Sequence, residues 1–366
     1  MRGEEKISSK QLHLMLVMTV LGTSIMALPT GVTVLAKQDA WLPLALAGLV
    51  NGYTAAVITA LGRRFPGRTF IQYLEDILGR SGGKLLALIY IVLFFIRTTS
   101  VIVREYGEFL TTTVMPDTPI SVFMIVVVLI AGYAVYNGVE VIGRTAEIFV
   151  PFVILPFLLL IPMVAHQIRA ERLLPVFASG FWPVVKGSLL PIGLGGEIFL
   201  AGMLLPFLNR PGEGRRAALA AVAVIYLLLI ATTILTIAVF GAAESGAYRY
   251  PAFNLARVAR LGPLDRLDPV AVAIWVAGGF VKVSVFYYAT VLGAAQWLGL
   301  RDYRPLVWPF SLIFVSTGYL LHENINALNY DFAKVFPFFV PPFEIIIPSI
   351  LLGAAIVKGR AGGRPD

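Results

Sequence analysis

Residues 181–207 read FWPVVKGSLLPIGLGGEIFLAGMLLPF, an apolar stretch of membrane-spanning length with Gly193, Gly195 and Gly196 at its middle. Backbone that leaves the helical path at bilayer depth is tolerated only where protein or a watery cavity satisfies its freed N–H and C=O groups. The glycine run therefore predicts an interrupted helix whose middle lines a cavity.

The segment 11–35 has the same character, with Gly22, Thr23 and Ser24 at its middle. The two segments lie near the start of each half of the chain. Paired interruptions in corresponding places of two halves indicate a small-solute site of the transporter type. The alternative is that the small residues serve close helix packing.

Composition places the whole chain in a membrane, because it is 58% hydrophobic and 14% charged, with a mean hydropathy of +0.83. Apolar stretches of about 20 residues, enough to cross a bilayer core, recur throughout the sequence. We expect one all-α transmembrane domain over residues 1–366. The ten expected spans are 11–35, 41–61, 85–113, 119–137, 145–165, 181–207, 217–241, 269–297, 305–321 and 337–357.

The distribution of basic residues predicts the orientation. With the N-terminus inside, the inner segments hold 17 Lys and Arg residues and the outer loops hold 8. This asymmetry favours both termini in the cytoplasm, with MRGEEKISSKQ as a retained tail rather than a signal peptide. The net charge of +8 then reflects topology and anionic lipid, so no nucleic-acid partner is expected.

Two loops predict short amphipathic helices. Residues 64–80 place five apolar side chains on one helical face, for an element on the inner surface. Those side chains are Phe70, Tyr73, Leu74, Ile77 and Leu78. Residues 250–261 predict a similar element outside, where it can cap a cavity. A solvated connector is the alternative for both.

A broken helix offers unpaired N–H groups that attract a carboxylate and free carbonyls that suit an ammonium group. A zwitterionic amino acid carries both charges, and apolar neighbours favour a small or aliphatic one. The substrate-binding candidates are Gly22, Thr23, Ser24, Ile25, Val101, Gly193, Gly195, Gly196, Glu197 and Phe199.

Ionisable residues inside spans are costly and point to function. In the third span Arg104 and Glu108 can pair at i,i+4, which gives a self-neutralised cluster. The alternative is a polar route to the site along Arg97, Val101 and Glu105. The candidates for a polar or coupling pathway are Arg97, Arg104, Glu105 and Lys282.

Glu197 follows the second glycine run directly, and Lys282 lies in the middle of the eighth span. Glu197 can accept a ligand ammonium, carry a coupling proton or neutralise a base such as Lys282. These three alternatives stay open. No catalytic motif, metal-ligand constellation or cofactor-binding loop is visible, and the absence of cysteine excludes disulfides and thiolate ligands. We therefore predict neither an enzyme nor a cofactor.

Three segments resemble the spore-germination permeases, the B-type membrane subunits of nutrient germinant receptors in the amino acid–polyamine–organocation superfamily. They are LLPVFASGFWPVVKGSLLP at 173–191, NGVEVIGRTAEIFVPF at 137–152 and KISSKQLHLMLVMTVLGTSIMALP at 6–29. The resemblance covers essentially the whole chain. It implies a LeuT-type inverted repeat of five plus five helices, with helices 1 and 6 broken around a ligand. It also implies that Lys282 replaces a sodium ion.

The resemblance favours a nutrient-sensing subunit that binds a small ligand, expected to be an amino acid, and triggers germination with partner subunits. The implied partners are a soluble-domain membrane protein and a lipoprotein, and the implied location is the spore inner membrane or bacterial cytoplasmic membrane. Two alternatives remain: a proton- or sodium-coupled amino-acid transporter, and a channel-like subunit that conducts water or ions.

Overall fold

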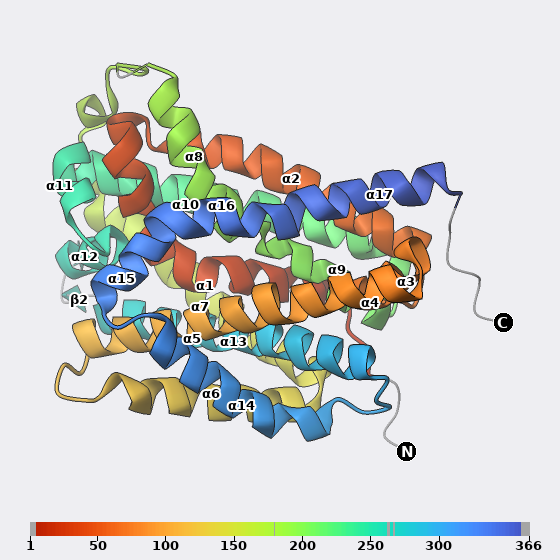
Figure 1. Cartoon of the computed structure of the whole chain (residues 1–366). Helices are drawn as coiled ribbons and strands as arrows, with labels where there is room; N and C mark the ends of the chain where they lie inside the picture. Colours follow the sequence, from red (N-terminus) through yellow and green to blue (C-terminus); the bar gives the residue numbers. More distant parts are fainter. Residues whose placement is uncertain (1–4, 179, 262–263, 266–267, 360–366) are drawn as a thin grey trace.

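The structure, a computed structural model, describes residues 5–178, 180–261, 264–265 and 268–359. In this part of the chain the only strands are β1 (Arg260–Leu261) and β2 (Leu264–Asp265), which form an antiparallel hairpin. Everything else regular is helical (Figure 1). The predicted all-α membrane class is therefore confirmed.

Nine helices among the described residues are long and apolar enough to cross a membrane. They are Ser9–Asp39, Trp41–Arg64, Arg80–Thr113, Ile120–Asn137, Val139–Gln167, Trp182–Phe207, Pro211–Phe240, Pro269–Leu298 and Ile325–Val357. The expected span 305–321 corresponds to α14 (Arg304–Leu321), which is not among the nine. Arg304 and two prolines dilute the apolar character of this helix.

The long helices are mostly single elements, and those of the third, sixth and tenth expected spans are composite. The single ones are α1 (Ser9–Ala36), α2 (Trp41–Arg64), α6 (Ile120–Asn137), α7 (Val139–Val164), α10 (Gly214–Phe240) and α13 (Asp268–Leu298). The third span joins α4 (Arg80–Ile89), η2 (Tyr90–Ile96) and α5 (Arg97–Thr113). The last joins α15 (Ile325–Tyr330), η8 (Asp331–Val335), α16 (Phe336–Pro341), η9 (Pro342–Ile346) and α17 (Ile347–Val357).

The helix α1 lies at the centre of the bundle (Figure 1), in contact with α7, α8 (Trp182–Gly195), α10 and α13. Its residues from Met15 to Met26 are all buried, so the middle of the helix is enclosed on every side. The helix α8 also contacts α2 and α16. The two glycine-bearing segments therefore occupy the interior, where the sequence placed the site.

The prediction of a helix interruption at Gly22 is wrong, because α1 is continuous from Ser9 to Ala36. Gly22 instead allows a close crossing with Gly278 of α13. A Cβ atom on Gly22 would stand 2.5 Å from the carbonyl oxygen of Gly278. The small residue serves backbone-to-backbone packing, which is its commoner use in membrane helices.

The second interruption takes the form of a change in helix type. The α-helix α8 ends at Gly195, and a 3-10 helix, η5 (Gly196–Leu200), follows before α9 (Ala201–Leu204) and η6 (Leu205–Phe207). Side chains reach the carbonyls just before the change: Tyr226 donates to Pro191 at 2.8 Å and Asn51 donates to Ile192 at 3.2 Å. Such donors satisfy backbone that a regular helix would pair internally.

The short elements gather at the two ends of the bundle. Both ends of the described chain lie at the end that carries α3 (Phe70–Leu78), while α11 (Ala242–Ala247), α12 (Pro251–Val258) and the hairpin lie at the other (Figure 1). The predicted helices within 64–80 and 250–261 are both present. Four of the five expected apolar side chains of α3 are buried, and Leu78 is exposed. Arg2, Arg266, Arg360 and Arg364, which entered the charge count, lie outside the described residues.

Candidate functional site

A buried ion pair lies in the core of the molecule, between α13 and η5 of the second half of the chain. Lys282 Nζ lies 2.8 Å from Glu197 Oε1, and each side chain is 1% exposed. The same ammonium group donates to the hydroxyl of Thr23 at 2.9 Å. These contacts connect α13, η5 and α1.

The helix crossing at Gly22 explains why these groups meet. Lys282 lies one turn after Gly278 on α13, and Thr23 directly follows Gly22 on α1. Because the two glycines bring the helix backbones into contact, a lysine one turn away reaches the Thr23 hydroxyl. Glu197 is the second residue of η5, so the change of helix type positions its carboxyl.

Two more carboxyls act on this cluster. Glu105 of α5 lies near Thr23 and interacts with Lys282 by charge. Glu344 of η9 is 1% exposed and interacts by charge with Glu197 and Lys282. One base thus faces three carboxyls from three elements. Buried charges are costly unless they are paired and hydrogen-bonded, so such a cluster is retained for function rather than for stability alone.

The glycines of the second run provide the space for this arrangement. A Cβ atom on Gly196 would stand 1.9 Å from Glu344 Oε2, and one on Gly195 would stand 2.1 Å from the Tyr226 hydroxyl. Gly193 packs against the ring of Phe336. Of the three, Gly195 and Gly196 therefore lie in the polar cluster, and Gly193 lies beside it.

The remaining binding candidates are spread over the core. Ser24 is buried, and within the described residues its hydroxyl has no hydrogen-bond partner. Val101 is buried, and Phe199 stacks on the ring of Tyr90 and meets the rings of Phe70 and Phe94 edge to face. Ile25 alone of the candidates lines the cavity described below.

The basic residues of the third span separate into two groups. Arg104 donates to Glu108 at 2.8 Å, and both side chains are buried, so the self-neutralised pair is present. Arg97 instead pairs with Asp331 of η8 at 2.6 Å and lies 4.4 Å over the ring of Phe339. Only Glu105 from this helix joins the Lys282 cluster.

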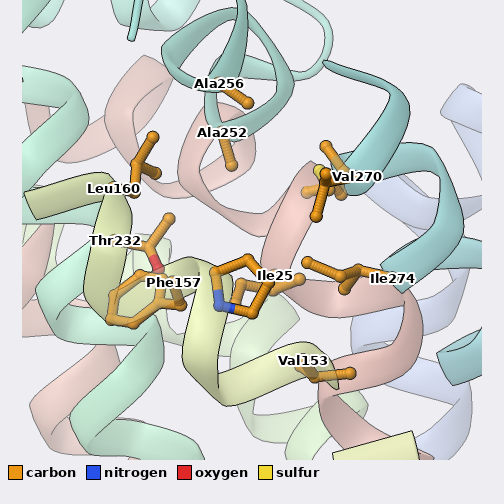
Figure 2. Close-up of a pocket in the computed structure, with 12 residues that line it drawn as sticks. Ile25, Val153, Phe157, Leu160, Thr232, Ala252, Ala256, Val270 and Ile274 are labelled. Carbon is orange, nitrogen blue, oxygen red and sulfur yellow. The ribbon is translucent and has the colours of Figure 1, made fainter. Parts of the chain in front are cut away.

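A small pocket of about 50 Å³ lies between α1, α7, α10, α12 and α13 (Figure 2). Its walls are apolar apart from Thr232, and Ala252 and Ala256 of α12 close one side. The element expected to cap a cavity does border one. Ile25 lies two residues beyond Thr23, so on the helix α1 the two side chains point to different faces, and the pocket is separate from the polar cluster.

Sequence reasoning missed Glu344, Asn51 and Asp331. Glu344 lies inside the expected span 337–357, in the stretch PPFEIII. The rule that marked Glu197, an ionisable residue within a span, applies to it equally. Short π-helical segments, which are frequent at functional sites, carry Glu344 in η9 and Asp331 in η8.

Similar proteins agree on one family. Spore germination protein KB of Bacillus subtilis (strain 168) is 26% identical over 97% of this chain and 96% of its own. Spore germination protein YndE of the same organism is 24% identical over 84% of this chain and 85% of its own. Among solved structures, Mhp1, a nucleobase-cation-symport-1 family transporter in a closed conformation with bromovinylhydantoin bound, covers 98% of this chain. The match spans 80% of Mhp1 with a TM-score of 0.69 at 10% identity, so it shows a shared LeuT-like transporter fold.

The sequence profile described as spore germination protein matches residues 6–326, nearly the whole chain. The protein therefore belongs to the spore germination permease family.

Proposed function

We propose that this protein is the nutrient-sensing, permease-like subunit of a spore germinant receptor. The observation that carries the proposal is the contact of Lys282 with Glu197 and Thr23, in a chain of the spore germination family. A small ligand that bound these groups would compete with contacts that now hold three helices together. The two arrangements of the bundle would then differ in affinity for the ligand, which is how binding shifts a conformational equilibrium.

The ligand we propose is an amino acid held where α8 passes into η5, opposite Thr23 and Ser24 of α1. Its binding residues would come from the sequence candidates that lie in or beside the polar cluster. We further propose the ten-span, five-plus-five inverted repeat as a single transmembrane domain, with α14 as the ninth span. The shared fold with Mhp1 supports this topology.

The proposed partners are a soluble-domain membrane protein and a lipoprotein, with which the subunit would trigger germination. The names of the relatives support this setting, since both are spore germination proteins. The proposed location is the spore inner membrane with both termini in the cytoplasm. The positions of the chain ends at one end of the bundle agree with termini on one side (Figure 1).

The transporter fold gives one second candidate, a proton- or sodium-coupled amino-acid transporter. Purified protein in liposomes distinguishes the two functions under an imposed proton or sodium gradient. The sensor predicts thermal stabilisation by one amino acid without its concentrative uptake. Concentrative uptake of that amino acid would replace the sensor by the transporter.

Spores test the sensing role directly. Deletion of this gene is expected to abolish germination with the stabilising amino acid, and a plasmid copy is expected to restore it. A copy that carries Thr23→Val, which keeps the side-chain volume and removes the hydroxyl that Lys282 contacts, is expected to respond only at higher ligand concentration. A wild-type dose response from this copy would contradict the proposed site.

A further inference from the structure

Beside the Lys282 pair lies a group of buried acceptor atoms without donors. Neither carboxyl oxygen of Glu344 has a hydrogen-bond partner within the described residues, and the same holds for Glu197 Oε2 and Asn51 Oδ1. Asn51 is completely buried, and Glu197 and Glu344 are each 1% exposed. A buried polar group that lacks a partner costs free energy, so several together indicate a missing donor.

These acceptors come from three elements that pack together, because η5 contacts both α2 and η9. Gly195 lies against the Asn51 amide and Gly196 lies against the Glu344 carboxyl. The Asn51 amide donates to the Tyr226 hydroxyl at 2.6 Å, and Tyr226 interacts by charge with both Glu197 and Glu344. The acceptors therefore surround the point at which α8 becomes η5.

A positive group here would balance the charge of the cluster. Lys282 is the base of the cluster, and its ammonium is already engaged by Glu197 and Thr23. Glu344 lies against Gly196, the residue before Glu197, and among the described residues no donor reaches its carboxyl oxygens. A cation at this position would compensate the excess of carboxyls over Lys282.

An ammonium group fits this need better than a metal ion. It carries three or more N–H donors, which matches an arrangement of acceptors that lack donors. Within the described residues, no three Asp, Glu or His side chains converge as metal ligands would. We infer that Glu344, with Glu197 and Asn51, forms a binding site for an ammonium cation, namely the amino group of the ligand. This inference rests on the proposed function for the identity of the ligand, while the site itself can be tested alone.

The test uses the purified full-length protein in detergent at constant ionic strength and pH, with ammonium chloride as the probe and potassium chloride as the control. Potassium is similar in size to ammonium but has no donors. We expect a saturable rise of the unfolding temperature with ammonium and none with potassium. Glu344→Gln is expected to weaken the apparent ammonium affinity about tenfold, the loss of one charge-assisted hydrogen bond.

Two variants make the result specific. Glu147→Gln removes a carboxyl of α7 that pairs with Lys10, remote from the cluster in its contacts, and is expected to leave the ammonium response unchanged. Glu344→Asp keeps the negative charge and withdraws it by one methylene, so a several-fold loss of ammonium affinity is expected. This variant provides the test if Glu344→Gln does not fold. Equal stabilisation by potassium, an unchanged response in both Glu344 variants, or no response in the wild type would overturn the site.

A second set of probes separates this inference from the proposed function. Methylammonium and a panel of amino acids are compared with carboxylic acids that lack the amino group, and only the amines are expected to depend on Glu344. If an amino acid stabilises wild type and Glu344→Gln equally, the sensor remains and the ammonium site is wrong. If ammonium binds through Glu344 but no amino acid triggers germination, the site stands and nutrient sensing fails.

Discussion

At the scale of single residues, the buried ammonium of Lys282 is the group whose removal we consider first. Its ammonium is buried with Glu197, and breaking such a pair leaves an uncompensated charge. We expect Lys282→Met to lower the free energy of unfolding by roughly 3 kcal/mol or more. Because the loss comes from the orphaned carboxyl, adding Glu197→Gln is expected to recover a large part of it. Thermal unfolding in detergent of both single variants and the double variant measures this coupling.

Lys10→Gln is the control for these unfolding measurements. It removes a lysine whose side chain is 73% exposed, so little change in stability is expected. Equal instability of Lys282→Met with and without Glu197→Gln would contradict the pairing. The sequence identified both residues because charges in spans are conspicuous. It left their pairing as one of three alternatives, because helix packing, not chain spacing, decides which buried charges meet.

At the scale of helices, the crossing of α1 and α13 fixes the geometry of the cluster. Backbone atoms of Gly278 occupy the space that a Cβ on Gly22 would need, so no side-chain rotation can relieve the clash. We expect Gly22→Ala and Gly278→Ala each to destabilise the protein by about 1–3 kcal/mol through overpacking. Both are also expected to separate Lys282 from Thr23. Thermal unfolding and ligand affinity of the two variants check this expectation.

Gly353→Ala in α17 is the matched control, because nothing lies within 4 Å of its added Cβ. It is expected to be neutral or stabilising by up to about 1 kcal/mol, since alanine is the better helix former. If all three glycine variants behaved alike, close packing at the crossing would be refuted. The sequence predicted a break at Gly22 because a glycine that bends a helix and one that packs it look the same. Which of the two roles Gly22 has depends on its contact with Gly278, a residue distant in the sequence.

At the scale of the whole molecule, the sequence predicted most of the architecture. Long apolar runs give helix positions directly, and most of the expected spans agree with helices of the structure to within a few residues. The last span was predicted too short, since its helix begins at Ile325 rather than at 337, and polar residues in its first turns hid them. Tertiary contacts at the bundle ends could not be predicted, because single polar residues carry them.

One set of these contacts holds the N-terminal segment against residues of the second half of the chain. Glu5 accepts from Arg304 at 2.8 Å and from Tyr303 at 3.2 Å, and Ile7 forms a parallel bridge with Leu208. Residues from both halves thus close one end of the molecule around a few tail residues. Glu5→Gln removes a partly exposed ion pair, so a modest loss of about 1 kcal/mol is expected.

Hydrogen exchange locates the effect of Glu5→Gln. The amide of Ile7 donates to the Phe207 carbonyl at 2.8 Å, and this bond is expected to exchange faster in the variant while the amides of α1 beyond its first turns do not change. Glu323→Gln, which alters an exposed carboxyl between α14 and α15, is expected to leave the Ile7 amide protected. Unchanged protection of Ile7 in Glu5→Gln would mean that the strand-like bridge alone holds the tail. In that case backbone pairing alone would hold the N-terminal segment at this end of the bundle, and the charge of Glu5 would have no part in it.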